Sequence, residues 1–138
     1  MSRVVYCVTV PVLVLGLSFG TACAVPIVKR PVVNEITFRL TPDRSEYLLS
    51  LYLNRGQTLK LTYTIVDIER TDPNFRSFST RHSWWDPSGT EEHWISPDLN
   101  IIKANKEGFY RFRFVVFFTP DTASILRSVT YLVRYEVR

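Results

Sequence analysis

The ten residues FYRFRFVVFF, positions 109–118, decide the fold that we predict for this chain. Apolar side chains occupy every second position, and Arg111 and Arg113 fall between them. Successive side chains of a strand point to opposite faces of a sheet, so this alternation indicates a β-strand with one buried face. Val115 and Phe117 make the second face apolar as well, which indicates a central strand that is buried on both sides toward its end.

The same period of two recurs before and after this stretch, and turn residues separate the segments. We expect strands over residues 34–40, 47–53, 58–68, 75–85, 93–95, 99–103, 109–118 and 128–137, with a single helical turn within 121–126. Seven to eight short strands at this spacing are typical of a sandwich. The predicted fold is therefore an all-β, antiparallel β-sandwich of jelly-roll type, preceded by an N-terminal hydrophobic signal segment.

The N-terminal segment has the features of an export signal. Arg3 precedes an apolar run over residues 4–20, and Ala22 and Ala24 occupy the two positions that a signal peptidase reads as small. Cleavage is therefore expected after Ala24. The predicted organisation is a signal peptide, a linker and a sandwich domain, at residues 1–24, 25–33 and 34–138.

Two alternatives for this segment stay open. Gly20-Thr21-Ala22-Cys23 resembles a bacterial lipobox, in which Cys23 carries the lipid. The apolar run is also close to the roughly 17 residues that a spanning helix needs, so it is long enough to remain as an anchor. Each alternative attaches the N-terminus to a membrane, and each keeps the protein extracytoplasmic.

Composition argues against several classes of function. Without Arg3 the chain has 16 basic and 13 acidic residues, and the absence of a basic stripe argues against nucleic acid as a partner. Both cysteines, Cys7 and Cys23, precede the predicted mature chain, which excludes an internal disulfide and a thiolate zinc site there. The sequence has no G-x-S-x-G elbow and no glycine-rich phosphate loop. We expect a protein that is not an enzyme and needs no cofactor.

The candidate binding residues lie between residues 82 and 94. Trp84 and Trp85 are adjacent on a predicted strand, so one must face the core and the other the opposite side. An exposed Trp can stack on a sugar or insert at a membrane interface. Trp94 lies on the far side of the same turn. We expect any binding surface to lie on the loop between Trp84 and Trp94.

His82 and His93 are the only histidines, and Asp86, Glu91 and Glu92 lie between them. These residue types can ligate a metal, but their spacing matches no recognised motif. Both histidines are expected at the surface beside a charged turn, and no metal site is predicted.

Several turn and core residues resemble those of the GOLD (Golgi dynamics) domain, a β-sandwich of about this size. The resemblance covers roughly Phe38 to Val137 and rests on four motifs: Gly56-Gln57, Asp86-Pro87-Ser88-Gly89, Gly108-Phe109-Tyr110-Arg111-Phe112 and Val129-Thr130-Tyr131. It implies a GOLD-like module that binds proteins or lipid-associated partners without catalysis. The same turns resemble small jelly-roll modules of secreted bacterial enzymes.

The predicted function is an extracytoplasmic, non-catalytic module that binds a protein, lipid or glycan surface. Two other classes remain. A carbohydrate-binding module would use Trp85 and Trp94, and a small metal-dependent enzyme would use His82 and His93.

Overall fold

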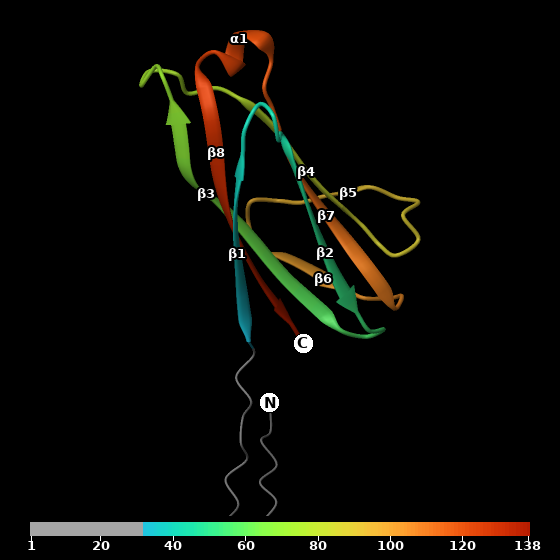
Figure 1. Cartoon of the computed structure of the whole chain (residues 1–138). Helices are drawn as coiled ribbons and strands as arrows, with labels where there is room; N and C mark the ends of the chain where they lie inside the picture. The colour runs from blue at the N-terminus through green and yellow to red at the C-terminus, as the bar shows by residue number, and fades with distance from the viewer. Residues whose placement is uncertain (1–31) are drawn as a thin grey trace, which may run out of the picture. The chain divides into compact units, whose positions relative to one another are not determined.

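A computed structural model of the chain describes residues 32–138, and Figure 1 shows them as two layers of strands. The elements are β1 (Val33–Leu40), β2 (Glu46–Leu53), β3 (Thr58–Arg70), β4 (Ser79–Trp85), β5 (His93–Trp94), β6 (Asn100–Lys103), β7 (Gly108–Phe117), α1 (Pro120–Ala123) and β8 (Leu126–Val137). The predicted signal peptide, Cys23 and most of the linker lie outside the described residues, so the statements about them stay predictions.

The eight strands form two antiparallel sheets of four strands each, in the orders β1-β8-β3-β6 and β2-β7-β4-β5. This confirms the predicted all-β, antiparallel sandwich. Consecutive strands β1 and β2 belong to different sheets, so the chain crosses between the layers after β1. Each layer is therefore built from strands that are distant in sequence, such as β2 with β7 and β1 with β8.

The predicted elements agree with the observed ones except in one segment. The strand expected over residues 75–85 begins only at Ser79. Phe75 and Phe78 pack against the core from outside any strand, and the Arg70 guanidinium donates a 2.6 Å hydrogen bond to the Phe75 carbonyl. The apolar residues of this segment therefore pack against the core without joining the sheet. The predicted helical turn is present as α1.

Strand β7 is central in its sheet, with β2 on one side and β4 on the other. Four inward side chains are buried, namely Tyr110, Phe112, Phe114 and Val116. Val115 on the other face is buried too, but Phe117 is half-exposed, so the predicted double burial is only partly correct. Val115 lies between Glu46 and Arg81 on the neighbouring strands, whereas Phe117 pairs with Ser79 alone because the β2 pairing begins at Glu46.

Aromatic rings fill much of the space between the two sheets. Phe38 of β1 stacks on Tyr47 of β2 with 4.0 Å between ring centroids, and on Tyr131 of β8 at 5.3 Å. Since the sequence has no cysteine after Cys23, burial of these rings and of the aliphatic core must supply the stability of the sandwich.

Candidate functional site

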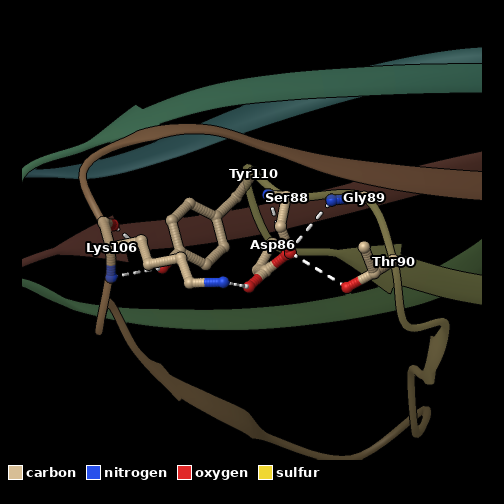
Figure 2. A network of polar contacts seen from close by, with 6 residues as sticks. All are labelled: Asp86, Ser88, Gly89, Thr90, Lys106 and Tyr110. Atoms are coloured by element: carbon tan, nitrogen blue, oxygen red, sulfur yellow. Dashed lines mark hydrogen bonds and ion pairs between the residues drawn. The ribbon is translucent and has the colours of Figure 1, made fainter.

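A tight polar turn follows β4 at one end of its sheet. The Asp86 Oδ1 atom accepts hydrogen bonds from the backbone N–H groups of Ser88, at 2.9 Å, and Gly89, at 3.2 Å. The Ser88 hydroxyl donates to the same oxygen and lies 3.1 Å from the Thr90 hydroxyl (Figure 2). Asp side chains favour such turns because they can replace a backbone acceptor. The side chain of Asp86 therefore fixes the conformation of the turn.

A second loop, between β6 and β7, braces this turn. The Lys106 ammonium donates to Asp86 Oδ2 at 3.1 Å, so one carboxylate joins the two loops (Figure 2). The hydroxyl of buried Tyr110 donates to the Lys106 carbonyl at 3.0 Å. The loop that carries Lys106 is thereby fixed to the core. We call Asp86, Ser88, Gly89, Thr90 and Lys106 the loop site.

Two glycines allow the chain to pack closely around the loop site. Gly89 has φ +66°, and a Cβ there would lie 2.5 Å from an Arg111 guanidinium nitrogen. Gly108 has φ +139°, and a Cβ there would lie 2.9 Å from the Pro87 Cβ. L-amino acids with a side chain rarely adopt either backbone conformation, and neither position has room for a Cβ. Both reasons favour glycine at these two positions.

The Asp86 carboxyl of the loop site stays ionised over the physiological pH range. The Ser88 hydroxyl, followed by Lys106 and the Gly89 N–H, lowers the pKa of the Asp86 carboxyl to about 2, against a smaller opposing effect of desolvation. A carboxylate with this pKa is too weak a base near neutral pH to activate the neighbouring Ser88 hydroxyl. The exposed Ser88, Thr90 and Lys106 are therefore suited to recognition rather than to nucleophilic catalysis.

The three tryptophans lie beside this turn but in different environments. Trp84 packs against the core and stacks on His93 at 4.2 Å, while Trp94 is 68% exposed. Trp85 is half-buried. The Arg81 guanidinium lies over the Trp94 ring, 4.9 Å from its centroid. One face of the most exposed tryptophan is therefore covered, which leaves less of it to stack on a sugar.

His82, expected at the surface, is instead buried within the core at 5% exposure. Its ring stacks on Tyr63 at 4.6 Å, and its Nε2 atom lies 3.1 Å from the Tyr131 hydroxyl. Burial lowers the pKa of His82 to about 4. The surface prediction failed because Tyr131 provides a polar partner inside the sandwich, so that the imidazole can be buried at small cost.

The two histidines do not form a metal site in the described part of the chain. His93 stacks on Trp84, whereas His82 contacts Tyr63 and Tyr131. Among residues 32–138 there is no group of three or more His, Cys, Asp or Glu that could hold a metal ion. Over the same residues, no helix has the length and apolarity needed to cross a membrane.

A shallow groove of about 500 Å³ lies between the edge strands β5 and β6. His93, Trp94, Leu99 and Ile101 are among its lining residues. Trp84, His93 and Trp94 are thus brought to one edge of the sandwich, while His82 lies inside it and Trp85 points to the opposite face of β4 from Trp84.

The turn at residues 86–89 is predicted by the sequence, but its contact with Lys106 is not. Lys106 follows Asp86 by 20 residues and lies in a loop of ordinary polar composition. The available signal was Gly108, because a glycine at the start of a strong strand indicates a close approach of another segment.

The described residues therefore form a small all-β sandwich with the loop site at one end. The fold is similar to that of PliG from Aeromonas hydrophila, a periplasmic lysozyme inhibitor of g-type lysozyme, with a TM-score of 0.51. That comparison has 11% sequence identity and covers 83% of this chain and 93% of the other.

Two other solved structures are also similar. A mutant of the Escherichia coli PliG gives a TM-score of 0.48 at 14% identity, covering 83% of this chain and 95% of the other. The Salmonella Typhimurium PliG gives 0.42 at 9% identity, covering 78% and 91%. No family model matches the sequence, the GOLD domain included, and no curated protein matches it.

Proposed function

We propose that this chain is an extracytoplasmic, non-catalytic protein that binds and inhibits another protein through the loop site, and that a g-type lysozyme is its target. The sandwich fold shared with the Aeromonas hydrophila inhibitor supports the class. The predicted leader over residues 1–24 agrees with the periplasmic location of that protein.

The observation that carries this proposal is the bracing of the turn Asp86–Gly89 by Lys106 and Tyr110. A loop that is already fixed in one conformation loses little conformational entropy when a partner binds it. It can therefore enter the cleft of another protein at small cost. A flexible loop would first have to be ordered.

The chemistry of the loop site fits the active-site cleft of a glycoside hydrolase. Such enzymes place two carboxyl groups on either side of the bond that they cleave. The exposed Lys106 ammonium has three N–H donors and gives one of them to Asp86, so two N–H groups are left for a carboxylate of a partner. These groups can bind carboxylates by charge-assisted hydrogen bonds. A loop so bound would exclude the substrate.

The GOLD resemblance implies a module that binds protein or lipid-associated partners. We retain the protein partner that this resemblance implies and propose an inhibitor in place of a GOLD-like module. The leader remains part of the proposal, with cleavage after Ala24. The intact mass of the protein from its own cells distinguishes a start at Val25 from a lipidated Cys23 and from a retained Met1.

Inhibition of a purified g-type lysozyme tests the proposal. We expect the wild-type protein to slow the hydrolysis of cell-wall peptidoglycan by this enzyme, and we expect Lys106→Glu to lose at least tenfold in inhibitory potency. Arg127→Glu is the matched control, because Arg127 is exposed and follows α1, outside the loop site. An enzyme that is equally active with and without the wild-type protein would refute the proposed target.

A further inference from the structure

The two sheets differ in the apolar side chains that they expose. The sheet that contains β8 exposes the aliphatic side chains of Val33, Val66 and Ile101, whereas the exposed aromatic rings of the described strands lie on the sheet that contains β7. On the sheet that contains β8, Glu35 of β1 and Arg134 of β8 form an ion pair, and threonines occupy neighbouring outward positions. On the sheet that contains β7, large apolar side chains stand exposed on the outer face. We call this second surface the aromatic face, with Leu48, Tyr52, Phe109, Arg111 and Trp94 as its members.

An aromatic pair lies at the end of the aromatic face nearest the loop site. Tyr52 and Phe109 are directly opposite each other on β2 and β7, with ring centroids 5.2 Å apart in an edge-to-face arrangement. They are 50% and 59% exposed. The Tyr52 hydroxyl donates a 2.5 Å hydrogen bond to Glu107, the residue that follows Lys106. The pair is therefore fixed in place beside the loop site while its apolar surface remains open.

Arg111 is the charged member of the aromatic face. It lies between Ser50 and Trp85 on the neighbouring strands. The two other arginines of this sheet form ion pairs, Arg81 with Glu92 and Arg113 with Glu46. Arg111 forms none with any residue in the described range 32–138. An exposed guanidinium without a carboxylate partner is complementary to a carboxylate on another molecule.

Arg111 also connects the aromatic face to the loop site. Its guanidinium passes so close to Gly89 that a Cβ there would lie 2.5 Å from one of its nitrogens. A partner that covers the turn Asp86–Gly89 would therefore also contact Arg111 and then Phe109, which lies two residues before Arg111 on the same face of β7. The two surfaces form one continuous area.

We propose that the aromatic face is a second contact area for the same protein partner, which places a carboxylate on Arg111 and apolar side chains on Tyr52 and Phe109. This inference rests on the proposed function, because it names the same partner. Trp, Tyr and Arg are enriched among the few interface residues whose removal weakens binding by about tenfold or more.

The dissociation constant for a g-type lysozyme, measured by surface plasmon resonance, tests this inference. We expect Phe109→Ser and Arg111→Gln each to weaken binding about tenfold or more. Arg127→Gln is the control for the loss of one arginine and should change the dissociation constant less than twofold. Each variant is first compared with wild type by circular dichroism and thermal unfolding. If Phe109→Ser unfolds the protein, Phe109→Leu takes its place, with an expected loss of about threefold.

The outcomes separate the inference from the proposed function. If the wild type binds the enzyme and both Phe109→Ser and Arg111→Gln bind it equally well, the inference is overturned, while the loop site retains its role. A wild type that does not bind the enzyme overturns both. A dimer in sedimentation that Phe109→Ser dissociates, or binding to phosphatidylglycerol vesicles that Arg111→Gln abolishes, assigns the aromatic face to a different occupant and also overturns the inference.

Discussion

His82 Nε2 lies 3.1 Å from the hydroxyl of Tyr131, which joins β4 of one sheet to β8 of the other across the core. This contact is a polar link between the two sheets within the core. Because the imidazole is desolvated there, its neutral form is strongly favoured. The link therefore makes the stability of the sandwich depend on pH.

The first prediction concerns acid sensitivity. The pKa of His82 is about 4 in the folded protein, below the 6.5 of an unfolded chain, so its contribution is complete above pH 6.5 and is lost as the pH falls toward 4. We expect about 2 kcal/mol of the free energy of unfolding to disappear between pH 7.5 and pH 4.5. Urea unfolding at the two pH values, with His82→Gln as the control without a titrating ring, measures this loss. Equal losses in both proteins would contradict it.

A second prediction concerns the packing of the two loops. Gly108→Ala combines an unfavourable φ with a contact to Pro87, whereas Gly56→Ala has an unfavourable φ of +90° and no atom within 4 Å of its new Cβ. We expect Gly56→Ala to cost about 1 kcal/mol of unfolding free energy and Gly108→Ala about 1–2 kcal/mol more. Chemical denaturation of both variants measures the difference. Identical losses of unfolding free energy in the two variants would show that a Cβ at position 108 does not clash with Pro87.

The bracing of the turn predicts a change in amide hydrogen exchange. In Asp86→Ala the Ser88 N–H loses its acceptor, whereas the Gly89 N–H keeps a 3.0 Å hydrogen bond to the backbone carbonyl of residue 86. We expect exchange at Ser88 to accelerate several-fold with little change in overall stability. The Asn74 N–H, which bonds to Asp72 Oδ1 at 2.8 Å, is the internal control in the same spectrum. The role of Asp86 is contradicted if Ser88 and Asn74 respond alike.

Much of the fold follows from local patterns. The alternation in residues 109–118 predicts a central strand because the side chains themselves carry the information about which face is buried. Phe75 and Phe78 could not be placed in the same way. Their composition is that of a strand, but whether they join the sheet depends on the pairing of β4 with β7, which begins only at Ser79.

The candidate site was predicted less completely than the fold. The turn at residues 86–89 is visible in the sequence, because Pro at the second position and Gly at the fourth are typical of a β-turn. Lys106 and Arg111 are not visible as site residues, since they lie 20 and 25 positions from Asp86 and come next to it only through the strand pairing. His82 was assigned to the surface because its partner, Tyr131, is 49 residues away.

The role of the loop site is tested most directly by nuclear magnetic resonance of the ¹⁵N-labelled protein during titration with a g-type lysozyme. We expect the amide signals of Ser88, Gly89 and Lys106 to shift or broaden first, while those of Arg127 and Arg134 stay in place. Unchanged signals at the loop site, with or without changes elsewhere, would contradict it.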